Sequence, residues 1–253
     1  MSWNDAAAYD AFMGRYSGPL APLFADLAEL TNRQEVLDVG CGTGMLTGEL
    51  VRRLGTDAVT ASEPSAAFVA SIEARFPGVD IRRAPAEHLP FEAGRFDAAL
   101  AQLVVHFMTD PVGGLNEMRR VTKPGGVVAA CVWDHAGGQG PLSTFWRAAH
   151  DLDVSAPDES SLAGARGGHL TEIMTAAGLR EISEDTLAVE VKHPTFEEWW
   201  EPFTRGVGPA GAYVLRLDAD RRAELREICR SELGEGDGPL TVRAAAWAAR
   251  GLA

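Results

Sequence analysis

The sequence predicts an α/β fold in which a mostly parallel sheet is covered by helices on both faces. The strongest indication is the run VLDVGCGTG at residues 36–44, where a short apolar strand leads into three glycines. A helical pattern begins near Met45, and further apolar segments alternate with helical stretches downstream, which is typical of parallel strands joined by helices. The 46% hydrophobic content over 253 residues allows one sizeable core with additional covering elements.

The remaining elements are expected in the following order. Strands are predicted over residues 36–39, 58–62, 96–102, 127–133 and 182–191. Residues 242–249 are expected to form the last strand, although their alanine richness also allows a helix. An amphipathic helix is expected over residues 219–233, and a short helix near residues 141–149.

The glycine turn predicts a binding site for a nucleotide-like cofactor. Glycine lets the backbone approach a ligand closely, and the helix start behind the turn offers free N–H groups and a partial positive charge. Gly40 and Gly42 fit the dinucleotide fingerprint G-x-G-x-x-G, but its third position is Met45, and the third glycine is Gly44. This spacing disfavours a nicotinamide dinucleotide.

The pattern instead resembles motif I of the class I S-adenosylmethionine (SAM)-dependent methyltransferases. The resemblance implies that Gly40, Cys41, Gly42 and Gly44 face the methionine part of SAM. It also implies that Asp38 holds the SAM ammonium group, directly or through water.

An acidic residue follows the second predicted strand, about 20 residues past the glycine turn, where such folds hold a ribose. Glu63 is this residue, and Pro64 comes directly after it. A carboxylate accepts two hydroxyl hydrogen bonds well because it has two acceptor oxygens. Favourable interaction with the dipole of the following helix is the alternative role of Glu63.

Two further segments are similar to the methyltransferase type 11 family. The stretch AEHLPF at residues 86–91, with GRFD at residues 94–97, resembles the segment that lies along the adenine, which implies contacts from Ala86 and Glu87. Pro85 stands where the family usually has an acid, so adenine recognition departs from the family pattern. RRVTKPGG at residues 119–126 resembles the family's turn before the fifth strand.

The resemblance covers roughly residues 36–134 and implies a Rossmann-like, seven-stranded sheet whose last strand is antiparallel. Gln102, at the tip of the fourth strand, is expected beside the sulfonium, with Leu103 packed on the adenine ring. YDAFMGRY at residues 9–16 resembles one branch of the family. Arg15 is expected to pair with the cofactor's carboxylate, and Tyr16 either to contact that carboxylate or to cap the site. The expected cofactor is SAM, with S-adenosylhomocysteine as product.

We expect one domain over residues 1–253, with a core at about 30–134 and 179–253. Lid elements are expected at about 1–25, 135–170 and 194–217. Aromatic residues in the last of these segments either pack the lid on the core or line a substrate pocket. An aromatic-walled pocket suits a small apolar or aromatic acceptor molecule.

Methyl transfer needs a general base only where the nucleophile arrives protonated. His106, just past the fourth strand, is the first candidate and His135, just past the fifth, is the second. For both, a histidine without catalytic function is the alternative. The acceptor atom, whether O, N or C, is left open.

Composition narrows the partners and the location. A formal net charge of −13 argues against a nucleic-acid partner. The three cysteines lack metal-type spacing, so no metal is expected, and they suit a reducing cytoplasm. We find no signal peptide and no membrane-spanning stretch in the sequence, and expect a monomer or homodimer.

Three other functions remain open. A SAM-binding enzyme of this fold catalysing a cyclisation or decarboxylation would turn substrate over without consuming SAM. An NAD-dependent oxidoreductase would bind a nicotinamide cofactor. A non-catalytic binding module would keep its partner after Gly42→Val, a change expected to block cofactor entry.

Overall fold

The computed structural model describes residues 9–234 and 238–253 and contains a seven-stranded sheet of order β3-β2-β1-β4-β5-β7-β6. The strands are β1 (Val36–Val39), β2 (Val59–Ser62), β3 (Asp80–Arg82), β4 (Phe96–Gln102), β5 (Thr122–Trp133), β6 (Arg180–His193) and β7 (Leu240–Leu252). β7 is antiparallel to both of its neighbours, and the pairs from β3 to β5 are parallel. The predicted Rossmann-like α/β sheet with an antiparallel last strand is confirmed.

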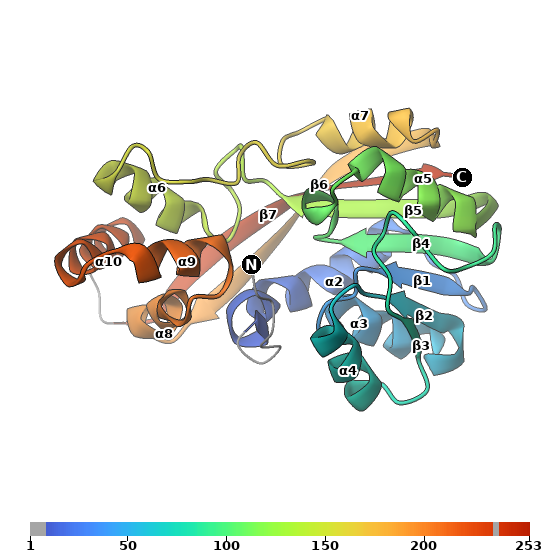
Figure 1. Cartoon of the computed structure of the whole chain (residues 1–253), viewed down its shortest axis with the longest axis horizontal. Coiled ribbons are helices and arrows are strands. Elements are labelled where there is room, and N and C mark those ends of the chain that lie inside the picture. The colour runs from blue at the N-terminus through green and yellow to red at the C-terminus, as the bar shows by residue number, and fades with distance from the viewer. Residues whose placement is uncertain (1–8, 235–237) are drawn as a thin grey trace.

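Helices cover the sheet on both faces. The helical elements, including π and 3-10 turns labelled η, are η1 (Asp10–Gly14), α2 (Arg15–Leu27), α3 (Met45–Leu54), η2 (Thr56–Ala58), α4 (Ala66–Arg75), η3 (Val105–Phe107), α5 (Pro111–Val121), α6 (Ser143–Leu152), α7 (His169–Ala176), α8 (Phe196–Trp200), η4 (Glu201–Arg205), α9 (Gly208–Arg216) and α10 (Ala219–Leu233). α2 packs against α3, and α5 packs against α7 on the other face (Figure 1). The result is the expected three-layer arrangement.

Side chains of the central strands alternate between the two faces of the sheet and pack against the helices on each face. Val36 of β1 and Leu100 of β4 belong to the apolar cluster that includes α2 and α3. Leu37 and Ala99, their chain neighbours, belong to the cluster under α5 and α7. Successive strand residues point to opposite faces, so strands this apolar must be covered on both sides.

Two strands differ from the expectation. β5 begins at Thr122 rather than near residue 127, because Phe96 pairs with Thr122 while Ala98 pairs with Val127, so the Lys-Pro-Gly-Gly segment is a register shift inside the strand. β7 is a strand throughout, despite its alanines, because it pairs along its length with both β5 and β6. Tertiary pairing here overrides helix propensity.

β6 and β7 extend beyond the rest of the sheet to a second group of helices, α6 and α8 to α10 (Figure 1). α10, which falls in the expected core range 179–253, packs against α6 of this group. Leu225 and Cys229 of α10 are both fully buried. We call α6, η4 and α8 to α10 the helical cap.

The cap is built around clustered aromatic rings. Phe145 stacks on Phe203 with ring centroids 4.6 Å apart, and Trp199 lies 4.9 Å from Phe203. Trp199 and Trp200 are chain neighbours, yet both are buried, at 2% and 5% exposure. Packing within the cap and onto the core is therefore the main role of these aromatic residues.

This packing leads to a stability prediction. Phe145→Ala should lower the free energy of unfolding by about 3–5 kcal/mol, because the fully buried ring leaves a cavity behind. Val154→Ala, at a side chain that is 92% exposed, serves as control and should change it by less than about 0.5 kcal/mol. Urea denaturation followed by circular dichroism measures both, and equal effects would contradict the role given to Phe145.

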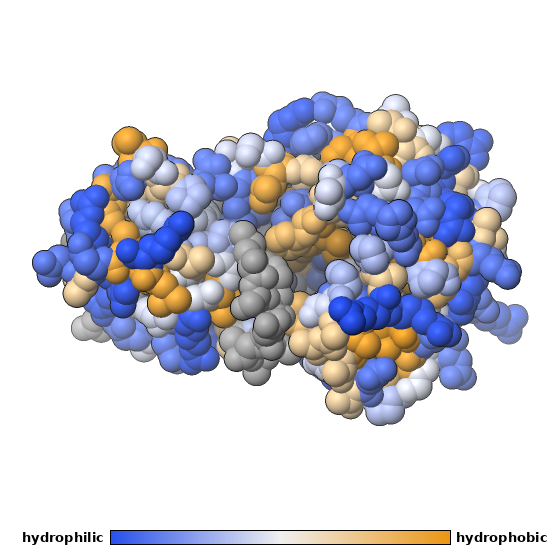
Figure 2. Space-filling view, viewed as in Figure 1, coloured by the Kyte–Doolittle hydropathy of each residue, from blue (hydrophilic) through white to orange (hydrophobic). Residues whose placement is uncertain are grey.

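Hydrophilic side chains dominate the outer surface of the face shown in Figure 2, in keeping with 36 acidic and 23 basic residues. No helix in the described part of the chain is long and apolar enough to cross a membrane. The three cysteines are free and buried, as expected of small apolar side chains.

Candidate active site

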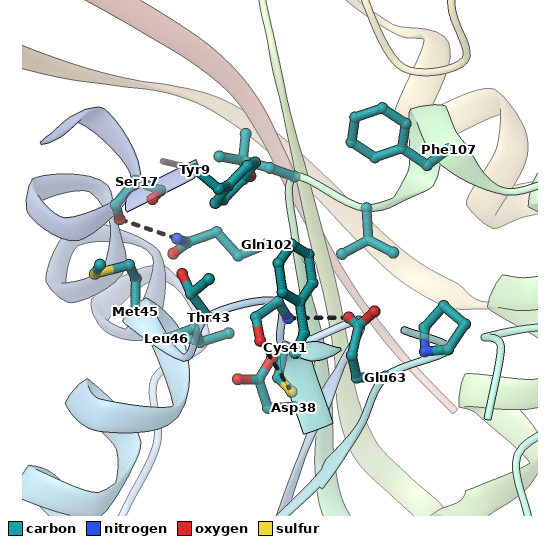
Figure 3. Close-up of a pocket in the computed structure, with 16 residues that line it drawn as sticks. Tyr9, Ser17, Asp38, Cys41, Thr43, Met45, Leu46, Glu63, Gln102 and Phe107 are labelled. Atoms are coloured by element: carbon teal, nitrogen blue, oxygen red, sulfur yellow. Dashed lines mark hydrogen bonds between the residues drawn. The ribbon is translucent and has the colours of Figure 1, made fainter. Parts of the chain in front are cut away.

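A cavity lies at the carboxyl ends of β1, β2 and β4 and holds about 830 Å³ of empty space, including its mouth. Open α/β sheets bind ligands at this edge. Eight of its lining residues were expected at the cofactor (Asp38, Gly40, Cys41, Gly42, Glu63, Pro64, Gln102 and Leu103), and eight were not (Tyr9, Ser17, Thr43, Met45, Leu46, Phe68, Val104 and Phe107). Figure 3 shows these side chains converging from both sides of the glycine turn.

The three glycines of the turn have different roles, although all have positive φ. A Cβ on Gly40 would lie 2.6 Å from Val104, and one on Gly44 would lie 2.5 Å from Ile72. A Cβ on Gly42 would meet no protein atom within 4 Å. Gly40 and Gly44 therefore allow close packing of the protein itself, whereas Gly42 keeps the cavity open.

Asp38 supplies a buried carboxylate at the end of β1. It is 1% exposed and accepts a 2.6 Å hydrogen bond from the Thr47 hydroxyl. Burial raises the pKa of Asp38 to about 7; the hydrogen bond from Thr47 opposes this rise, and the charge of Glu63 adds to it. A cationic group beside Asp38 would restore its ionised form, because opposite charge favours the carboxylate.

Glu63, at the tip of β2, connects two parts of the cavity wall. Its carboxylate accepts a hydrogen bond from the backbone N–H of Gly42 at 3.0 Å (Figure 3) and another from that of Ser65 at 2.8 Å. Burial raises the pKa of Glu63, while these two backbone hydrogen bonds oppose the rise. Each oxygen keeps lone-pair capacity for a diol.

The tip of β4 provides one polar and one strained residue. The Gln102 amide donates to the Ser17 carbonyl at 3.0 Å, and its buried Oε1 has no hydrogen-bond partner among the described residues. Leu103 has φ +62°, which an L side chain rarely adopts. Strain at a cavity wall is common at functional sites.

The N-terminal segment closes one side of the cavity. Asp10 accepts a short hydrogen bond from the Thr43 hydroxyl, and Arg75 donates to the Thr43 carbonyl at 3.0 Å. The Tyr9 ring lies 5.7 Å from that of Phe68. Burial, and then the nearby charges of Glu63 and Asp10, raise the pKa of Tyr9 to about 12, so its phenol stays neutral.

The expected residues Arg15 and Tyr16 do not line this cavity. The Tyr16 hydroxyl lies 2.9 Å from Nε2 of His193, and an Arg15 nitrogen lies 3.3 Å from Nδ1 of the same ring. Burial, and then the charge of Arg15, lower the pKa of His193 to about 4. Both residues thus fasten α2 to the end of β6, a partner that lies far away in sequence.

Three other expected residues also lie outside the cavity. Gly44 packs on α4, as described above. Ala86 is buried in the apolar cluster beneath α5, beside Gly114. Glu87 accepts a 2.8 Å hydrogen bond from the Thr109 backbone N–H and so fixes the chain entering α5.

A second, smaller cavity adjoins the first and holds about 490 Å³ including its mouth. The two share Tyr9, Leu103 and Phe107. Its other lining residues are mostly apolar (Phe12, Met13, Trp133, Leu142, Gly208 and Pro209). The remaining ones are Glu159 and both predicted catalytic histidines, His106 and His135. Segments distant in sequence therefore meet at one apolar site.

The two histidines face each other with ring centroids 5.9 Å apart. Nδ1 of His106 and Nε2 of His135 are buried without a hydrogen-bond partner in the described part of the chain. Burial, and then the charge of His135, lower the pKa of His106 to about 3. Burial also lowers the pKa of His135, but nearby carboxylates, Glu159 first, oppose this change.

Several lining residues that the sequence analysis does not predict have positions in the sequence that indicate a place on the cavity wall. Thr43 lies within the glycine run, whose other members were assigned to the cofactor. Phe68 and Phe107 lie shortly after the tips of β2 and β4, where wall residues are common in this fold. Glu159 had no such signal, since it lies in an irregular stretch far from either strand tip.

Residues 37–130 match a family model described as a methyltransferase domain. The chain therefore contains a methyltransferase domain, which agrees with its resemblance to the class I SAM-dependent methyltransferases. The matched range contains most of β1, the glycine turn, Glu63 and the tip of β4. The expected cofactor is therefore SAM, and the first cavity contains the residues that fit it.

Two curated relatives show how far the similarity extends. An uncharacterized protein of Mycobacterium tuberculosis is 27% identical over 242 residues, covering 90% of this chain and 86% of the relative. A ubiquinone biosynthesis O-methyltransferase of Cereibacter sphaeroides is 40% identical over 96 residues, or 37% of this chain and 38% of that enzyme.

Solved structures share the fold. A candidate type II methyltransferase of Anaeromyxobacter dehalogenans is 24% identical, with a TM-score of 0.63, covering 92% of this chain and 95% of that one. The [4+2]-cyclase SpnF is 23% identical, with a TM-score of 0.55, covering 99% and 85%. At these identities the likeness concerns the fold alone.

The residues of the first cavity suit SAM on three grounds. A buried carboxylate with a raised pKa favours a cation such as the SAM ammonium. Gly42 leaves open the space that a Cβ would fill. Glu63 offers two acceptor oxygens for ribose hydroxyls at the tip of β2.

Proposed function

We propose that this methyltransferase transfers the methyl group of SAM to an O, N or C atom of a small apolar or aromatic molecule bound in the second cavity. The observation that carries the proposal is the shared wall of Tyr9, Leu103 and Phe107. A molecule in the second cavity reaches the methyl donor without passing through solvent. The apolar lining excludes water, which would otherwise compete with the acceptor molecule for the methyl group.

In this proposal SAM supplies, when bound, an electrophilic methyl group on a positively charged sulfur. Asp38 holds the ammonium end and Glu63 the ribose. Gln102, at the tip of β4, lines the first cavity, and its buried Oε1 has no hydrogen-bond partner among the described residues. These residues fix the donor, so that alignment with the acceptor provides much of the rate increase.

His106 and His135 are the candidates for taking a proton from the acceptor. Both line the second cavity, and each has a nitrogen with no hydrogen-bond partner among the described residues. The lowered pKa of His106 keeps its ring neutral at pH 7 and able to hydrogen-bond, but makes it a weak base. His135, with carboxylates nearby, is better placed to hold a proton.

A second candidate is a non-methylating reaction such as a cyclisation, with SAM retained. The same fold occurs in a [4+2]-cyclase. The apolar second cavity suits a flexible hydrophobic substrate held in a folded conformation. A cyclisation of such a substrate needs no proton acceptor. The paired histidines favour methyl transfer over this alternative.

The test is to incubate the protein with SAM carrying an isotopically labelled methyl group and a panel of aromatic small molecules. We expect label in the acceptor and one S-adenosylhomocysteine formed per product. His135→Ala should lower kcat by about 10²-fold or more for acceptors that carry a proton, with SAM binding unchanged. Product formation without S-adenosylhomocysteine would favour the cyclisation instead.

A further inference from the structure

Glu159 is the buried acid of the second cavity, and it lies outside every motif of the sequence. It is 8% exposed and belongs to the irregular stretch between α6 and α7. Its Oε2 accepts a 3.0 Å hydrogen bond from Nε1 of Trp146. The same oxygen lies 3.8 Å from Nδ1 of His135. Buried acids are rare without a partner or a function.

The contact between Glu159 and His135 fixes the state of the imidazole. A carboxylate facing Nδ1 favours a proton on that nitrogen, which leaves Nε2 with a free lone pair. Nε2 of His135 is the atom that has no partner among the described residues. At 3.8 Å the two groups interact through charge rather than through a regular hydrogen bond.

We propose that Glu159 is a positioning residue that holds His135 in the Nδ1–H form, so that Nε2 takes the proton of a hydroxyl-bearing acceptor such as a phenol or an enol. This inference rests on the proposed function and narrows the acceptor atom to oxygen. The O–CH₃ bond forms as the S–CH₃ bond of SAM breaks, and the hydroxyl proton moves to Nε2. The products are a neutral ether, S-adenosylhomocysteine and an imidazolium beside Glu159.

A hydroxyl group matches the two histidines better than an ammonium group does. A hydroxyl donates one hydrogen bond and accepts others, so it can give its proton to His135 while accepting from His106. The two rings lie close together, with centroids 5.9 Å apart, and both line the cavity in which the hydroxyl would bind. An ammonium offers only donors and would lose its hydration in a mostly apolar cavity.

Charge also distinguishes the two rings as proton acceptors. Glu159, Asp134 and Asp158 all act on His135, in that order. His106 faces another imidazole. Tyr9, also on the wall, stays neutral and adds no charge. A proton on His135 therefore finishes next to negative charge, whereas a proton on His106 would be repelled by a protonated His135.

The test compares Glu159→Gln with Asp151→Asn, an exposed acid of α6, using SAM with 4-methylphenol and with 4-nitrophenol. Glu159→Gln should lower kcat for 4-methylphenol by about 10-fold to 100-fold with little change in KM, and shift the acid limb of its pH profile. The loss should be small for 4-nitrophenol, which ionises without help. Glu159→Asp, which keeps the charge, should retain part of the activity, and Asp151→Asn should match the wild type.

Calorimetric titration with SAM confirms that each variant is folded and binds its cofactor. Equal slowing of both phenols by Glu159→Gln, or equal loss in Asp151→Asn, would overturn the role of Glu159. Transfer to benzylamine but to neither phenol would overturn the hydroxyl acceptor and leave methyl transfer standing. SAM binding without transfer to any of the three probes would count against the proposed function itself.

Discussion

Gly42→Val should abolish SAM binding while leaving the protein folded. The new side chain would project into empty space, since a Cβ on Gly42 meets no protein atom within 4 Å. It would occupy volume that the methyl donor needs, and we expect the affinity to fall by at least about 100-fold, or about 2.7 kcal/mol. Isothermal titration calorimetry with SAM measures the loss.

The matched control for this variant is Gly94→Val. Gly94 has φ +66°, close to the +55° of Gly42, and a Cβ at this position would meet nothing nearer than 4.0 Å. Both variants carry the cost of a side chain in the left-handed region, about 1–2 kcal/mol or somewhat more for valine. Only Gly42 lies on the cavity, so equal loss of SAM binding in the two variants would show that strain rather than space explains the effect.

SAM affinity should rise with pH up to about pH 7 because of Asp38. The folded protein without ligand holds a proton on Asp38 below its pKa of about 7, and the ligand's ammonium needs the carboxylate. Binding therefore releases a proton, and the affinity should rise up to about tenfold per pH unit below pH 7 and level off above it. Calorimetry in buffers of different ionisation enthalpy counts the released proton.

The ionisation of Asp38 also affects the stability of the folded protein, and here the effect of rising pH is opposite to its effect on SAM affinity. The pKa of Asp38 is higher in the folded than in the unfolded chain, so the folded state binds the extra proton between about pH 4 and 7. The free energy of unfolding without ligand should therefore fall as the pH rises through this window. SAM should cancel the effect by pairing its cation with the carboxylate.

Asp38→Asn separates the charge from the shape of the side chain. The variant should lose both pH dependences and bind SAM about 10-fold to 100-fold more weakly, since the ammonium loses its counter-charge. Asp151→Asn, at an exposed position of α6, should behave like the wild type. A pH dependence that persists in Asp38→Asn would assign the proton to another group, with Glu63 the nearest candidate.

The first cavity could be predicted from sequence because its parts are local. A strand, a glycine turn and a helix start lie within one short run, and backbone geometry there depends on neighbouring residues. The acids at the ends of β1 and β2 then fall at the same sheet edge by topology alone. Asp38, Glu63 and Gln102 follow from this reasoning, and all three line the first cavity.

The errors of placement arise where packing between distant segments decides. Local resemblance assigns Tyr16 and Arg15 to the cofactor, but β6 brings His193 to them. Glu87 caps the approach to α5, which its motif does not reveal. Residues 123–126 form a register shift inside β5 rather than a turn before it, because β4 pairs on both sides of them.

The sequence by itself therefore determined the fold class, the expected methyl donor and the sheet edge where the first cavity lies. These depend on strand order and on a contiguous turn, both of which are encoded in short-range patterns. Only the tertiary structure showed which glycine keeps the cavity open, and that His106, His135 and Glu159 meet at one apolar site. Those facts depend on side chains from separate segments packing against each other, and no local pattern specifies such contacts.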